Sequence, residues 1–187
     1  MNVGFAICGS FCTFSKIFPI MKSLQDQHSL TPIFSEAAYS TDTRFGTAAE
    51  HIRTAETICR TATLHSIVDT EPVGPRKQFD ILVIAPCTGN TLAKLAHGIA
   101  DGPVTMAAKS HLRNGRPILI AISTNDALST AAENIAKLMI KKHYYFVPYS
   151  QDDCASKPYS MVADFSYIPQ AMDAALKEQQ IQPIIIR

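Results

Sequence analysis

The side chains best suited to chemistry form a short polar run directly after an apolar segment. Residues 79–85 are mainly apolar and typical of a buried strand, whereas Leu92, Leu95 and Ile99 recur at the spacing of one helical face. A strand that turns sharply into a helix puts the helix N-terminus at the carboxyl edge of the sheet, where unpaired N–H groups and the helix dipole favour an anion. We therefore expect an anion site there, formed by Pro86, Thr88, Gly89, Asn90 and Thr91.

Three more polar loops follow expected strands. Ligands of open α/β sheets bind beyond the carboxyl ends of the strands, and small polar side chains there suit a phosphate or a small polyanion. The chain has neither a G-x-G-x-x-G run nor a lysine-bearing phosphate loop, so a mononucleotide or a small anionic substrate is favoured over a dinucleotide. The binding candidates in these loops are Gly9, Ser10, Cys12, Thr13, Ser35, Ser123, Thr124 and Asn125.

Three charged or titratable residues are further candidates. Arg44, on a polar loop, could clamp a carboxylate through two parallel N–H groups, or form a surface ion pair. Asp126 and His65 are candidate catalytic acid–base residues, although Asp126 equally suits the start of a helix. Thr13 and Thr88 likewise suit helix caps. The sequence does not choose between these uses.

Composition restricts the class of protein. The 187 residues are 47% hydrophobic, enough for one folded domain spanning 1–187. The net charge of +1 argues against nucleic acid or an anionic membrane as a partner, and no apolar run is long enough to cross a bilayer. The five cysteines form no Cys-x-x-Cys pair and the histidines no ligand cluster, so we expect a reducing compartment and no metal site. No signal-peptide pattern is present, which favours the cytoplasm.

Strand and helix patterns alternate along the chain. This alternation predicts an α/β fold with a mostly parallel sheet covered by helices on both faces. The expected strands are 3–8, 30–34, 79–85, 117–122 and 144–148, with an edge strand at 183–186. The expected helices are 13–24, 48–59, 87–100, 103–112, 128–139 and 168–176; loops are expected at 35–46 and 150–160, and an irregular stretch at 61–78.

Several of these segments resemble a known family. The run Ala85-Pro86-Cys87-Thr88-Gly89-Asn90-Thr91 resembles the A-P-x-T-x-N-T signature of the flavoprotein family, which includes flavin-dependent cysteine decarboxylases. Other segments resemble one group of that family, the B subunits of dipicolinate synthase. They are residues 9–13, 41–46, 71–75, 106–109, 113–117, 122–128 and 151–153.

The resemblance implies a three-layer α/β/α Rossmann-like fold and a homo-oligomer built from trimers. It also implies a sporulation protein of the mother cell, which works with a separate NAD(P)-dependent protein, the A subunit of the synthase. Together they would convert a tetrahydrodipicolinate-type precursor from the lysine pathway to the dicarboxylate dipicolinate.

Two departures from the flavin-binding decarboxylases leave alternatives open. Residues 123–126 stand where those enzymes carry a Pro-Ala-Met-Asn-type segment, and His51 lies only in the general region of their catalytic histidine. The alternatives are an FMN-binding decarboxylase or oxidoreductase, and a non-catalytic scaffold for the A subunit.

Overall fold

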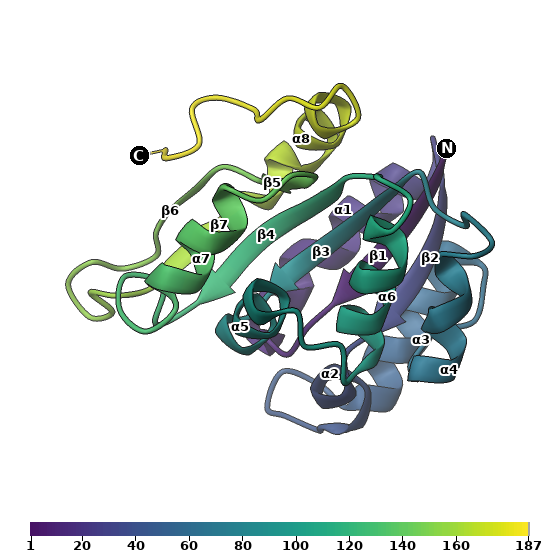
Figure 1. Ribbon diagram of the computed structural model, residues 1–187. Coiled ribbons are helices and arrows are strands. Elements are labelled where there is room, and N and C mark those ends of the chain that lie inside the picture. Colours follow the sequence, from purple (N-terminus) through teal and green to yellow (C-terminus); the bar gives the residue numbers. More distant parts are fainter. Residues whose placement is uncertain (187) are drawn as a thin grey trace.

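The computed structural model describes residues 1–186 and is built on one seven-stranded sheet (Figure 1). The strand order is β2-β1-β3-β4-β7-β6, with β5 paired to β4 as well. The strands are β1 (Asn2–Ile7), β2 (Ser29–Phe34), β3 (Ile81–Cys87), β4 (Ile118–Thr124), β5 (Tyr144–Phe146), β6 (Tyr149–Gln151) and β7 (Met161–Ala163). The helices are α1 (Phe14–Gln25), α2 (Glu36–Ser40), α3 (Ala48–Cys59), α4 (Ile67–Thr70), α5 (Gly89–His97), α6 (Pro103–Leu112), α7 (Ala132–Met139) and α8 (Ile168–Ala175).

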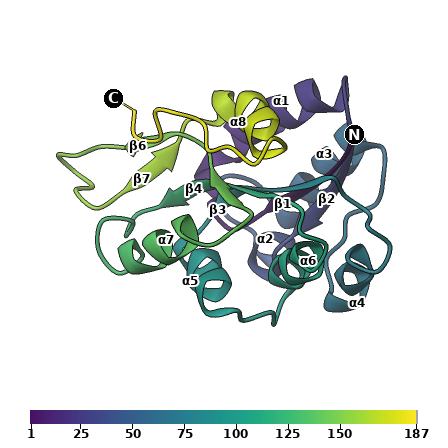
Figure 2. The ribbon, with the colours of Figure 1, turned by 45° about the horizontal axis from the view of Figure 1, so that its top comes forward.

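Helices cover both faces of this sheet. Helices α1, α3 and α8 lie on one face and α4, α5, α6 and α7 on the other, so the fold is a three-layer Rossmann-like α/β/α sandwich (Figure 2). The strands β1, β3 and β4 are fully buried over most of their length, because each has a helical layer on either side. The α/β fold with its mostly parallel sheet, expected from the alternating pattern, is confirmed.

The parallel strands bring the predicted loops to one edge. Strands β1, β2, β3, β4 and β5 pair in parallel, so the segments that follow β1, β3 and β4 leave the sheet side by side. No helix among residues 1–186 is both long and apolar enough to span a bilayer.

The last part of the sheet differs from the expected topology. Strand β4 pairs in parallel with β5 through its first half, and antiparallel with β7 through Ser123 and Thr124. Strands β6 and β7 form a hairpin whose connecting loop is 152–160, so of the expected loop 150–160 only Ser150 and Gln151 belong to a strand, and the pairing of the flanking strands was not expected. Each strand has only three residues and β6 is polar, so no apolar alternation marked them. The expected edge strand at 183–186 is reduced to one parallel bridge between Tyr149 and Ile185.

Three helix boundaries also need correction. The expected loop 35–46 contains α2, which Ser35 caps by accepting a hydrogen bond from Ala38 N at 3.2 Å. Helix α5 ends at His97 because Gly98 adopts a left-handed conformation, with φ of 71°. The expected helix 128–139 begins only at residue 132, and Leu128 is half exposed in the preceding turn.

Candidate functional site

A wide cleft lies at the carboxyl edge of the sheet and is here called the main cleft. Its volume is about 850 Å³. The loops after β1, β3 and β4 form its walls, and the hairpin between β6 and β7 closes one side. It brings together eleven of the predicted site residues: Gly9, Ser10, Cys12, Thr13, Thr88, Gly89, Asn90, Ser123, Thr124, Asn125 and Asp126.

A hydrogen bond between two of these loops fixes the floor of the main cleft. Ser10 Oγ and Ser123 Oγ lie 2.8 Å apart, which joins the loop after β1 to the end of β4 across 113 positions of sequence. Ser123 is buried whereas Ser10 is partly exposed to the cleft, so the pair is part-buried. Thr13 tightens the same loop because its hydroxyl donates to Ser10 O at 2.8 Å.

The N-terminus of α5 opens into the main cleft. Thr88 caps this helix, since Thr88 Oγ1 accepts from Thr91 N at 3.4 Å, in agreement with the helix-cap alternative. Thr91 is buried and its hydroxyl donates to Cys8 Sγ at 3.3 Å. The exposed Asn90 side chain has no hydrogen-bond partner among residues 1–186 and is available to a ligand.

Asp126 places a negative charge in the same cleft. Burial opposes ionisation of this carboxyl group, but hydrogen bonds donated by Thr124 and Thr130 outweigh burial, so the pKa of Asp126 is lowered. The carboxylate lies against Gly89, where an added Cβ would stand 2.7 Å from Asp126 Oδ1. Asp126 is therefore ionised at neutral pH, and it can accept a proton or a hydrogen bond but can act as an acid only after it has accepted a proton.

A second hollow, the side cleft, adjoins the main cleft and shares Gly9, Thr88 and Asn90 with it. Its volume is about 340 Å³, and Ser35 and Thr91 lie in its lining. Lys94 contributes a cation, which pairs with Asp101 at 2.8 Å. Because they share three lining residues, the two clefts adjoin along the edge of the sheet.

Two lysines of the main cleft were not among the candidates expected from the sequence. Lys16 comes from the first turns of α1, and Lys157 from the hairpin segment. Lys157 pairs with Asp152 at 2.6 Å, and this ion pair is exposed and weak in water. Neither lysine lies in a motif, and only the fold brings them to the cleft. Phe11, Phe45, Ser160 and Val162 complete the lining.

Three predicted site residues lie outside both clefts. Pro86 is the buried second-to-last residue of β3, and its carbonyl oxygen accepts a hydrogen bond from Cys8 N at 3.2 Å. Arg44 is exposed and its guanidinium lies 4.9 Å from the ring centroid of Phe45, which itself lines the main cleft.

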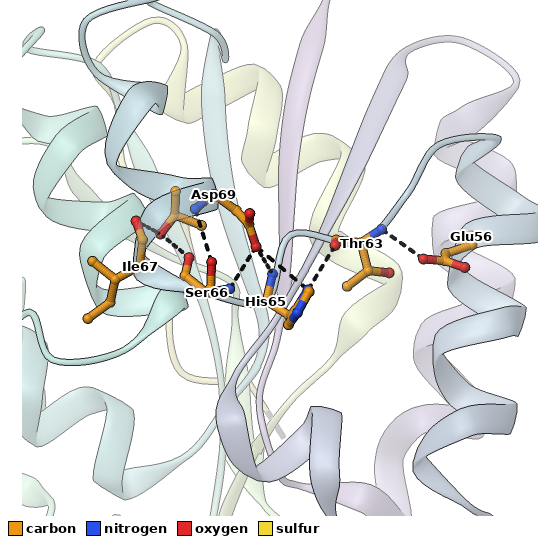
Figure 3. Close-up of polar contacts among 7 residues, drawn as sticks. Glu56, Thr63, His65, Ser66, Ile67 and Asp69 are labelled. Atoms are coloured by element: carbon orange, nitrogen blue, oxygen red, sulfur yellow. Dashed lines mark hydrogen bonds and ion pairs between the residues drawn. The ribbon is translucent and has the colours of Figure 1, made fainter.

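His65, the third, occupies a separate polar cluster at the start of α4 (Figure 3). Its Nδ1 lies 3.4 Å from Thr63 O and 3.6 Å from Asp69 Oδ2, and its ring stacks on Tyr39 at 4.1 Å. These contacts orient His65 toward α4 and not toward either cleft. Geometry therefore favours Asp126 over His65 as the residue able to exchange a proton with a ligand in the main cleft.

His51 is buried among aromatic rings. Phe14 lies 4.8 Å away edge-on and Phe18 lies 6.0 Å away, and His51 Nε2 has no hydrogen-bond partner among residues 1–186. Burial lowers the pKa of His51, which keeps the ring neutral.

The thiols of Cys8 and Cys87 are buried too, and burial raises their pKa, so both behave as small apolar side chains. Within residues 1–186 no three His, Cys, Asp or Glu side chains gather closely enough to hold a metal ion.

Comparison with known proteins places this architecture among flavoproteins. Residues 1–172 match the family model described as Flavoprotein. The B subunit of dipicolinate synthase from Bacillus subtilis (strain 168) is 43% identical over 186 residues, covering 99% of this chain and 93% of that protein. The crystal structure of the dipicolinate synthase B subunit from Bacillus halodurans superposes with a TM-score of 0.91 at 42% identity, covering 100% and 96% of the two chains.

More distant structures share the fold alone. The FMN-dependent cysteine decarboxylase SpaF superposes with a TM-score of 0.71 at 20% identity, covering 95% of this chain and 97% of that one. The FMN binding protein AtHal3 gives 0.69 at 17% identity, covering 96% and 98%.

Proposed function

The chain belongs to the flavoprotein family and, within it, to the B subunits of dipicolinate synthase, and from this premise we propose that it works with an NAD(P)-dependent A subunit to make dipicolinate. The substrate is a tetrahydrodipicolinate-type dicarboxylate bound in the main cleft. The convergence of the loops after β1, β3 and β4 on one polar cleft carries this proposal. We further propose that residues 1–187 act as one domain, in a trimer-based homo-oligomer in the cytoplasm of the sporulating mother cell.

The dicarboxylate needs donors for two carboxylates. The N-terminus of α5 with Asn90 supplies one set, and Lys16 supplies a cation on the facing wall. Lys157 joins Lys16 when its exposed pair with Asp152 opens. The hydroxyls of Ser10 and Ser123 complete the polar floor.

Two chemical steps separate the precursor from dipicolinate. A hydroxylated ring first loses water, and a hydride then passes to NAD(P)⁺ with release of a proton. Asp126 is placed to accept the proton removed from the ring during loss of water, because its carboxylate lies against the N-terminus of α5 and its lowered pKa keeps it ionised. The protonated Asp126 then returns this proton to the departing hydroxyl group, so that water leaves and the carboxylate is restored. The A subunit supplies the nicotinamide for the second step, so no oxidation is assigned to this chain.

Reconstitution tests this proposal. Both subunits are mixed with the precursor and NAD(P)⁺, and reduction of the nicotinamide is followed by its absorbance. We expect reduction only when both subunits are present. Full activity of the A subunit without this chain would overturn a catalytic role. An equal rate with the main-cleft variant Asn90→Ala would favour the scaffold alternative.

An FMN-dependent function is the second candidate, supported by the family and its FMN-binding neighbours. Part of the donor set fits this cofactor, whereas the carboxylate of Glu36 in the side cleft opposes a phosphate. The side cleft offers Lys94 and the hydroxyl of Ser35 to a phosphate, and the main cleft offers the rings of Phe11 and Phe45 to a planar ring system. FMN would supply one- or two-electron redox chemistry. The visible absorption spectrum of the freshly purified protein tests for it, and a stoichiometric flavin band would favour this candidate.

A further inference from the structure

A third hollow, here called the lysine pocket, shares no lining residue with the main cleft and shares only Thr105 with the side cleft. Its volume is about 430 Å³. Helix α5 starts in the main cleft and ends beside this pocket, so Asn90 of the cleft and Leu95 of the pocket lie about 7.5 Å apart along the helix axis. The lining comes from the end of α5, one side of α6 and the start of β5. It consists of Leu95, Gly98, Ile99, Ala100, Thr105, Lys109, Leu112, Lys141, Lys142, His143 and Tyr144.

The charges of the lysine pocket are unbalanced. Lys109, Lys141 and Lys142 line it, and no Asp or Glu does. In the main cleft, by contrast, two lysines face two aspartates. Because the whole chain has a net charge of only +1, three unopposed ammonium groups at one pocket are a local concentration of positive charge.

Structural roles account for only one of these lysines. Lys141 Nζ donates to Ala96 O at 2.7 Å, so it satisfies a carbonyl group at the C-terminus of α5. Lys109 and Lys142 are exposed and form no ion pair within residues 1–186. Asp101, which follows the lining residue Ala100 in the sequence, pairs with Lys94.

The wall between these cations is apolar. Leu95 and Tyr144 are buried at its base, whereas Ile99 is 46% exposed at its mouth. A ligand that covers Ile99 and reaches the ammonium groups would gain from apolar burial and from charge at once. A strongly hydrated ion such as phosphate would gain only from the charge.

We propose that the lysine pocket is a second anion site that takes a planar aromatic carboxylate. The ring lies against Ile99 and Leu95, and the carboxylates reach Lys109 and Lys142. The choice of a dicarboxylate as the ligand to test rests on the proposed function, because dipicolinate is such a molecule. The pocket itself is argued from its own residues and is independent of the main cleft.

Calorimetry with benzene-1,3-dicarboxylate in metal-free buffer tests this site. That probe lacks the ring nitrogen of dipicolinate and so does not add the heat of metal chelation. We expect two binding events in the unaltered protein. Replacing both Lys109→Gln and Lys142→Gln should weaken one event by about tenfold or more, since hydrogen bonds to charged groups are lost. The matched control Lys137→Gln removes the same kind of charge from α7 outside the pocket and should change affinity less than about twofold.

Three further measurements make the outcome decisive. Ile99→Ser should weaken the same event while leaving every charge in place, and an unchanged affinity would overturn the aromatic class of ligand. Inorganic phosphate that binds as tightly as the probe would also overturn it. The variant Lys16→Gln with Asn90→Ala separates the two proposals. If it removes all binding, the lysine pocket is refuted and the main cleft stands; if it changes nothing while the pocket variant removes all binding, the main cleft fails instead.

Discussion

The substitution Gly89→Ala tests the packing at the floor of the main cleft. A Cβ at residue 89 would stand 2.7 Å from Asp126 Oδ1 and 2.8 Å from Thr124 Oγ1, closer than carbon and oxygen can approach without displacement. Both atoms belong to side chains that hydrogen-bond to each other, so the methyl group must separate them or shift α5. Overpacking of this kind costs about 1–3 kcal/mol. For a chain of this length, each kcal/mol lowers Tm by about 2–4 °C.

The matched control is Gly102→Ala, at the N-cap of α6. Its added Cβ meets nothing nearer than Thr105 Oγ1 at 4.0 Å, so the change should cost only the weak N-cap preference of Gly over Ala, about 0.5 kcal/mol. Urea unfolding and a thermal scan give the two stabilities, and calorimetry gives dicarboxylate binding. We expect Gly89→Ala to lose both stability and binding relative to the control. Equal stability and equal binding in the two variants would refute the placement of Asp126 against α5.

Two further predictions concern stability. Burial lowers the pKa of His111 to about 4 in the folded protein. Below pH 6.5 the unfolded chain therefore binds more protons than the folded one, and the free energy of unfolding should fall by about 3 kcal/mol between pH 6.5 and 4. The glutamine in His111→Gln can still donate a hydrogen bond to Pro117 O, and this variant should reduce the difference in unfolding free energy between urea titrations at pH 7 and 4.5. The same difference in the variant as in the unaltered protein would exclude His111 as the cause of the pH dependence. Ser10→Ala and Ser123→Ala should each cost about 1 kcal/mol, and a double-mutant cycle should show coupling, whereas additive losses would contradict the bond between the two loops.

The sequence predicted the centre of the site because local patterns determine it. Residues 85–91 combine an apolar run, a cap and helical spacing, and each of these depends on neighbours in the chain. Their meeting with Ser10 and Ser123 followed from a general property of parallel sheets, which place the carboxyl ends of strands at one edge.

The remainder of the site depends on contacts between distant segments. Strands β6 and β7 have only three residues each and β6 is polar, so the strands that flank the loop carrying Lys157 were not recognised. Lys16 lies on the exposed side of α1, where lysine is ordinary, and only the fold turns that position toward the cleft. The periodic apolar residue Leu128 misled the assignment of α7 because its segment is held as a turn by Asp126.

The rate of nicotinamide reduction in the reconstituted pair of subunits tests the main cleft most directly. Asn90→Ala removes an exposed side-chain amide near the N-terminus of α5, in the main cleft. Asn134→Ala removes the same kind of side chain from α7, away from the cleft. We expect kcat/KM to fall by about tenfold or more for Asn90→Ala and to change little for Asn134→Ala, since one polar contact to a charged ligand is lost. Equal rates for the two variants, with both assembled normally on the A subunit, would contradict the claim that the reacting dicarboxylate binds where these loops converge.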